Sequence, residues 1–181
     1  MKKFALAVYG GAFNPPHPGH ATVVASLLDK AEKVVVVPSY AHPFGKKMMP
    51  FEQRVRWAKA MIANFDPNIV SVETCEMDAA LIKSPVFSID LLRFIADRDK
   101  IEGKEIALVM GEDVGDIFKT FYGYDDIISE FSTLVVSETI HLHSSMIREK
   151  LLEEGDIPSE WKLSGVPMED YLQFATLKQS A

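Results

Sequence analysis

Cysteine is almost absent from this chain of 181 residues, which holds only Cys75. A single thiol cannot form an internal disulfide, and this fits a reducing, cytoplasmic setting. The same scarcity excludes a zinc site built from a cluster of cysteines and histidines. No apolar run reaches the ~18–20 residues of a membrane-spanning helix. Residues 1–9 also lack the apolar segment and cleavage site of a signal peptide.

Positive charge is also in short supply. The 19 lysines and arginines are outnumbered by 26 acidic residues, which gives a net charge of −7 at pH 7. Such a chain is a poor match for a general nucleic-acid surface, although a local basic site for phosphates stays open. The length suits one domain with its own core. We therefore expect a single domain over residues 1–181 that binds neither nucleic acid nor a membrane.

Apolar runs and amphipathic runs alternate along the chain. Four consecutive valines at 34–37 are typical of a parallel strand that is covered on both faces. Strands are expected at about 4–9, 33–38, 69–75, 105–110 and 131–136. Helices are expected at about 21–30, 51–64, 88–99, 144–154 and 168–177, with a short helical segment after Gly111 and irregular structure over 76–87.

This alternation predicts the α/β class: a three-layer Rossmann-like sandwich with a parallel sheet of five to six strands. In such a sheet, ligands bind beyond the carboxyl ends of the strands, near the point where the strand order reverses.

The segment GGAFNPPHPGH, residues 10–20, connects the first expected strand to the first expected helix. Its two adjacent glycines let the backbone turn tightly and approach a ligand. If the helix starts near Pro16, His17 and His20 share one face of its first turn, beside free N–H groups and the positive end of the helix dipole. This arrangement predicts a polyphosphate site. The alternative is a stiff loop with two surface histidines.

A second helix start carries Ser144, Ser145, Met146, Ile147 and Arg148. The serines can donate at the positive end of the helix dipole, and an arginine can bind two phosphate oxygens at once. The alternative is an ordinary helix cap followed by a surface arginine.

Together these motifs resemble those of a known family. Gly-Gly-x-Phe-Asn-Pro-x-His-x-Gly-His is similar to the signature of the nucleotidyltransferase superfamily, and within it to the nicotinate/nicotinamide mononucleotide adenylyltransferases. The second motif resembles the Ser-Ser-Thr-x-Ile-Arg-like motif of that family, with Met146 at the usual threonine position. The resemblance implies that AMP is transferred from ATP to a pyridine mononucleotide in NAD biosynthesis, with release of pyrophosphate. It also implies Mg²⁺ carried by the substrates, and no metal held by the protein.

The resemblance also implies roles for individual residues. The catalytic residues would be His17, His20 and Arg148. ATP and its phosphates would be held by Gly10, Gly11, Ala12, Phe13, Lys46, Arg54, Gly111, Asp113, Ser144 and Ser145. The pyridine-nucleotide side would be formed by Asn14, Phe87, Ser88 and Phe121.

Several alternatives stay open at this point. Lys47 can replace Lys46, and Asp113 can instead cap a helix. The sequence does not decide between nicotinate and nicotinamide, or between a monomer and a homo-oligomer. The rival functions are nucleotidyl transfer to phosphopantetheine or a phosphorylated alcohol, and a nucleotide-binding module without catalysis.

Overall fold

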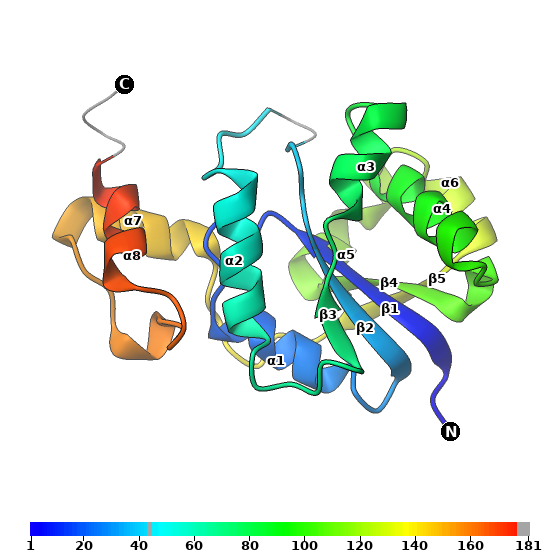
Figure 1. The fold of residues 1–181 in the computed structure, drawn as a ribbon, viewed down its shortest axis with the longest axis horizontal. Helices are drawn as coiled ribbons and strands as arrows, with labels where there is room; N and C mark the ends of the chain where they lie inside the picture. Colours follow the sequence, from blue (N-terminus) through cyan, green and yellow to red (C-terminus); the bar gives the residue numbers. More distant parts are fainter. Residues whose placement is uncertain (43–44, 177–181) are drawn as a thin grey trace.

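The computed structural model describes residues 1–42 and 45–176. Its centre is one sheet of five strands in the order β3-β2-β1-β4-β5, and every neighbouring pair is parallel (Figure 1). The strands are β1 Phe4–Gly11, β2 Ala31–Pro38, β3 Val70–Val72, β4 Ile106–Gly111 and β5 Ser132–Val136. The predicted parallel sheet is confirmed. The strand order reverses between β1 and β4, so the expected ligand site lies at the carboxyl ends of these two strands.

Helices cover both faces of the sheet. One face is covered by α1 Pro18–Ser26 and α2 Phe51–Met61. The other is covered by α3 Cys75–Ile82, α4 Ser88–Asp99, α5 Glu112–Ile117 and α6 Tyr124–Glu130. Along β1, Ala7 and Tyr9 pack toward the first face, and Leu6 and Val8 pack toward the second. This alternation is the two-residue period of a strand. The three layers of the predicted sandwich are therefore present.

A pair of C-terminal helices, α7 Ser144–Glu154 and α8 Met168–Thr176, lies at the end of the molecule beyond α2 (Figure 1). A third apolar cluster joins this pair to α2 through Trp57, Tyr171 and Phe174. The indole N–H of Trp57 donates a hydrogen bond of 2.8 Å to Asp170. Short 3₁₀ turns complete the described secondary structure at Gly103–Glu105, Phe118–Thr120 and Ser159–Trp161.

Several predicted boundaries were wrong. Residues 75–82 form α3 instead of irregular structure, because Cys75 and Ala79, one turn apart, both enter the core. β3 is only three residues long, and α1 starts earlier than expected, at Pro18. The helix α6 was missed because only Ile127 among its residues is buried. The part of the last predicted helix beyond residue 176 lies outside the described residues.

Among the described residues, none of the helices combines the length and the apolar character that a bilayer crossing requires.

Candidate active site

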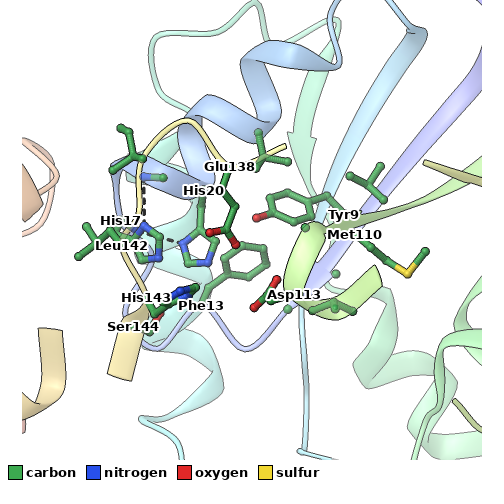
Figure 2. Close-up of a pocket in the computed structure, with 18 residues that line it drawn as sticks. Tyr9, Phe13, His17, His20, Met110, Asp113, Glu138, Leu142, His143 and Ser144 are labelled. Atoms are coloured by element: carbon green, nitrogen blue, oxygen red, sulfur yellow. Dashed lines mark hydrogen bonds between the residues drawn. The ribbon is translucent and has the colours of Figure 1, made fainter. Parts of the chain in front are cut away.

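The two histidines of the first motif lie at the start of α1. His17 is the N-cap residue, and its Nδ1 accepts a hydrogen bond from the backbone N–H of Gly19 at 3.0 Å. The Nδ1 of His20 accepts one from the backbone N–H of His17 at 3.1 Å. Because both Nδ1 atoms are acceptors, each neutral ring carries its proton on Nε2. The rings stack with their centroids 3.8 Å apart (Figure 2), so the turn presents a pair of Nε2–H donors.

Burial sets the charge of these rings. It lowers the pKa of His17 to about 4, with help from the charge of His143. Burial also lowers the pKa of His20 well below its ordinary value, and the charges of His17 and His143 act in the same direction. Both imidazoles are therefore neutral at pH 7 in the free protein. Their Nε2–H groups attract an anion as dipoles at the positive end of α1.

Gly19 is required by the packing of this turn. A Cβ at this position would lie 2.8 Å from Cε1 of His17, which is closer than real side chains approach. The glycine thus lets the His17 ring fold back over the helix start.

A first cavity of about 200 Å³ opens beside the histidines, between the ends of β1 and β4 (Figure 2). Its described lining contains neither lysine nor arginine. The predicted site residues that line it are Gly10, Gly11, Phe13, His17, His20, Gly111, Asp113 and Ser144. The cavity thus lies at the predicted point of the sheet.

A second cavity brings together Asn14, Lys47 and Arg148, beside Phe174 of α8. The guanidinium of Arg148 donates a hydrogen bond of 2.8 Å to the carbonyl oxygen of Asn14. Arg148 is therefore tied to the first motif, but it does not line the cavity of the histidines. Of the two loop lysines, Lys47 lines the second cavity and Lys46 lines neither.

The start of α7 is also tied to the first motif. The hydroxyl of Ser144 donates a hydrogen bond of 2.7 Å to the carbonyl oxygen of Pro15. The N-cap of α7 is His143, so neither Ser144 nor Ser145 is the N-cap of this helix. Ser145 is exposed and lines neither cavity. The predicted end of this helix at residue 154 is confirmed, and Gly155, in the left-handed conformation, follows it.

Arg54, expected on the phosphates, is almost completely buried, with 1% of its surface exposed. Its Nε donates to the carbonyl oxygen of Met49 at 2.8 Å, and its Nη1 donates to that of Ala12 at 2.9 Å. The side-chain oxygen of Asn14 accepts a hydrogen bond of 3.0 Å from the backbone N–H of Met49. These contacts join the loop after β2 to the glycine turn. They place Arg54 under the site, where it positions the two loops.

On the predicted pyridine side, the ring of Phe87 lies 4.6 Å from that of Tyr122, centroid to centroid. Phe121, expected here, packs instead against Phe118 in the core of the second face. The exposed aromatic ring is Tyr122, with 59% of its surface accessible. Ser88 is the first residue of α4, whose N-cap is Phe87 rather than Ser88.

Sequence reasoning missed three titratable residues of the first cavity: Tyr9, Glu138 and His143. Ligand atoms of Asp113, Glu138 and His143 all lie within 4.8 Å of one another. Burial, followed by the charges of Asp113 and Glu138, raises the pKa of Tyr9. Glu138 follows β5 at the carboxyl edge of the sheet, and His143 directly precedes α7. In the sequence, only the positions of Glu138 after an expected strand and of His143 before an expected helix could have indicated that they belong to the site. Asp113 does not cap α5, whose N-cap is Gly111.

Comparison with known proteins places the chain in a family. A family model described as cytidylyltransferase-like matches residues 8–160. The chain belongs to the cytidylyltransferase-like family. The match runs from within β1 to the turn after α7, so it includes both motifs and the whole lining of the first cavity, whereas Phe174 of the second cavity lies beyond it.

Individual relatives of this cytidylyltransferase-like chain carry a more specific name. A protein of Thermotoga sp. (strain RQ2), named "probable nicotinate-nucleotide adenylyltransferase", is 30% identical over 133 residues. That alignment covers 72% of this chain but only 63% of the relative. A Vibrio parahaemolyticus structure assigned to nicotinate-nucleotide adenylyltransferase has a TM-score of 0.76 at 26% identity, covering 97% of this chain and 96% of that one.

A third neighbour supports the fold alone. The nicotinic acid mononucleotide adenylyltransferase of Plasmodium falciparum, complexed with NaAD, has a TM-score of 0.70 at 16% identity. It is matched over 99% of this chain and 98% of its own.

Proposed function

We propose that this protein transfers the adenylyl group of ATP to nicotinate mononucleotide and releases pyrophosphate. The observation that carries the proposal is the turn of His17 and His20, whose paired Nε2–H donors line a cavity where the strand order reverses. The names of the Thermotoga and Vibrio relatives support the acceptor. We also propose that residues 1–181 act as one catalytic domain.

The proposed reaction needs neither a general base nor a covalent intermediate, because the mononucleotide phosphate is already an anion. One of its oxygens attacks the α-phosphorus of ATP in line. The bond between that phosphorus and the bridging oxygen breaks, and pyrophosphate leaves with the electron pair. The task of the protein is to align two polyanions and to stabilise the charge that develops on the leaving group. A divalent cation, when bound to the phosphates, supplies part of that stabilisation.

The two cavities suggest how the substrates are arranged. We place the triphosphate in the first cavity, where the Nε2–H groups of His17 and His20 donate to its oxygens. Asp113, on the same wall, is placed to accept from the ribose hydroxyls of the ATP. Arg148 and Lys47 of the second cavity would then hold phosphates from the side of Asn14. Arg54 acts indirectly, through the two loops that it joins.

The test is release of pyrophosphate from ATP in the presence of one phosphorylated acceptor at a time. The panel is nicotinate mononucleotide, nicotinamide mononucleotide, phosphopantetheine and glycerol 3-phosphate, and chromatography identifies the product. We expect a dinucleotide, with nicotinate mononucleotide giving the highest kcat/KM. A preference for either of the last two acceptors would move the protein to another branch of the family. No release with any acceptor would contradict adenylyl transfer to these acceptors.

His20→Ala should lower kcat by roughly 10²–10³-fold, which is the usual effect of removing one preorganised donor. The matched control is His141→Ala, because His141 is exposed and lines neither cavity. Equal turnover by the two variants would remove His20 from the mechanism.

A further inference from the structure

The first cavity is acidic, which is unusual for a site that faces a triphosphate. Its described lining includes the carboxylates of Asp113 and Glu138, but neither lysine nor arginine. The histidines that share it are neutral at pH 7, because burial lowers the pKa of both. Two carboxylates beside a polyanion repel it unless a cation lies between them. The protein itself does not supply that cation from the described lining.

Three side chains of this cavity are arranged as metal ligands. Asp113 lies in the first turn of α5, Glu138 in the loop after β5, and His143 just before α7. Their ligand atoms lie within 4.8 Å of one another. Metal–ligand distances are about 2.0–2.6 Å, so ligands on opposite sides of one ion are about 4–5 Å apart. The three atoms can therefore share an ion after small side-chain movements.

The backbone leaves room for these carboxylates at Gly111. A Cβ built there would lie 3.0 Å from Oδ1 of Asp113 and 3.4 Å from Oε1 of Glu138. The two acidic side chains thus converge over the same glycine, and Figure 2 shows them with His143 among the residues that line the cavity. Within residues 1–42 and 45–176, none of these three side chains forms a hydrogen bond or a salt bridge.

Tyr9 provides a second, independent observation. Its side chain is 8% exposed and lines the cavity next to His20. Its hydroxyl forms no hydrogen bond to any described residue. Asp113 and Glu138 are the charged groups that act on it, and Figure 2 shows the hydroxyl pointing to the side of Glu138. Among the described residues, no completely buried side-chain polar atom lacks a partner, so the Tyr9 hydroxyl faces the open cavity, where a ligand or its bound water can accept its hydrogen bond.

We propose that Asp113, Glu138 and His143 bind a divalent transition-metal ion directly, without nucleotide. Two carboxylates and one imidazole suit Mn²⁺ better than Mg²⁺, which prefers oxygen ligands alone. The remaining positions on the ion would be open to water, and the Tyr9 hydroxyl can donate to one such water. The role of this ion beside a triphosphate rests on the proposed adenylyl transfer. The ion site itself does not.

The test is a titration of Mn²⁺ alone into chelator-treated, nucleotide-free protein at pH 7, with free Mn²⁺ measured by electron paramagnetic resonance. We expect one Mn²⁺ per chain, and at least a tenfold weaker affinity in Glu138→Gln. The matched control is Glu112→Gln, which removes the same charge from the neighbour of Asp113 but lies outside the cavity lining. Circular dichroism and the melting temperature of each variant show whether it has folded.

A pulsed resonance experiment identifies the nitrogen ligand. Coupling of the bound Mn²⁺ to an imidazole nitrogen should be present in the wild-type protein and lost in His143→Gln. Coupling that persists in this variant would assign the nitrogen to another residue and overturn the proposed ligand set.

Two further outcomes would overturn the proposal: no binding of Mn²⁺ to the free protein, or equal weakening by Glu112→Gln and Glu138→Gln. Weakened ATP binding in Glu138→Gln without any binding of Mn²⁺ alone would instead make Glu138 an acceptor for ribose hydroxyls. Because the titration contains no substrate, it is independent of the proposed reaction. Mn²⁺ binding with no turnover of any acceptor would leave the ion site standing and remove adenylyl transfer.

Discussion

In His17 and His20, one ring nitrogen stabilises the fold and the other is available for chemistry. In both rings Nδ1 is used internally, by the N–H of Gly19 and by the N–H of His17. Nε2 is left for the cavity. The backbone of the turn thereby selects the tautomer in which both side chains are donors. A substitution at His17 therefore removes a helix cap as well as a donor.

Nitrogen-15 spectra of the imidazoles test this assignment. At pH 6 the rings of His17 and His20 should be neutral with the proton on Nε2, because burial lowers the pKa of His17 to about 4 and that of His20 well below its ordinary value. A histidine in the unfolded protein titrates near 6.5. The free energy of unfolding should accordingly lose a contribution as the pH falls from about 6.5 toward 4, where the unfolded chain binds protons first. Imidazolium signals from both residues at pH 6 would contradict the assignment.

At the scale of elements, α2 and α3 hold the loop after β2 from two sides. Arg54 of α2 donates to the carbonyl oxygen of Met49, near the end of this loop. Glu76 of α3 accepts a hydrogen bond of 3.0 Å from the backbone N–H of Tyr40, near its beginning. Both charged side chains are buried, and they attract each other. The loop beside the second cavity is thus fixed by one buried arginine and one buried glutamate.

Glu76 should make stability depend on pH in a defined direction. Burial raises the pKa of its carboxyl to about 7, although the N–H of Tyr40 and the charge of Arg54 act against this rise. Between about pH 4.5 and 7 the folded state keeps a proton that the unfolded state has lost. The contribution of Glu76 is therefore greatest at low pH and falls as the pH rises through this window. At about 1.4 kcal/mol per pKa unit, the loss approaches about 3 kcal/mol at pH 8.

Glu76→Gln keeps the acceptor for Tyr40 and removes the titration. Its melting temperature relative to the wild type should therefore rise between pH 5 and pH 8. The lowered pKa values of His17 and His20 affect the stability of both proteins equally, so their pH dependence cancels in the difference between the two melting temperatures. Asp78→Asn, an exposed position on the same helix, serves as the control. Parallel curves for Glu76→Gln and the wild type would show that Glu76 is already ionised at pH 5.

At the scale of the whole molecule, the C-terminal helices connect the third apolar cluster to the site. Phe174 and Tyr171 of α8 pack with Trp57 of α2 and with the buried side of α7. The first turns of α7 bind the first motif through Ser144 and Arg148. A change that weakens the packing of α8 should therefore lower the catalytic activity, because it shifts α7 and its contacts with the first motif.

Phe174→Ala should lower the free energy of unfolding by about 3–5 kcal/mol, the usual cost of removing a buried aromatic ring. In a Trp161→Phe background, the emission of Trp57 should shift to the red, and pyrophosphate release should fall with it. Leu172→Ala on the same helix is the control, because 40% of Leu172 is already exposed. Equal losses of stability in both variants would show that α8 does not dock through Phe174.

The sequence predicted the sheet and the centre of the candidate site because their signals are local. Consecutive valines at 34–37 indicate a covered parallel strand, and the spacing of His17 and His20 indicates a shared helical face. The placement of Glu138 could not be predicted in this way, since it reaches the cavity only after β4 and β5 pair. The burial of Arg54 could not be predicted from the sequence either. Its acceptors are backbone carbonyls, and no residue type marks them in the sequence.

The hydrogen bonds from α7 to the first motif join positions 129 and 134 residues apart in the chain. During synthesis, the ribosome adds about 5–20 residues per second, so on the order of 10 seconds separate the appearance of the two partners. For that interval the glycine turn and its histidines have already been synthesised, while the segment that secures them is still being made. The candidate site is therefore one of the last parts of the molecule that a growing chain can complete. A chain released early would carry the phosphate-binding signature without the contacts that hold it in place.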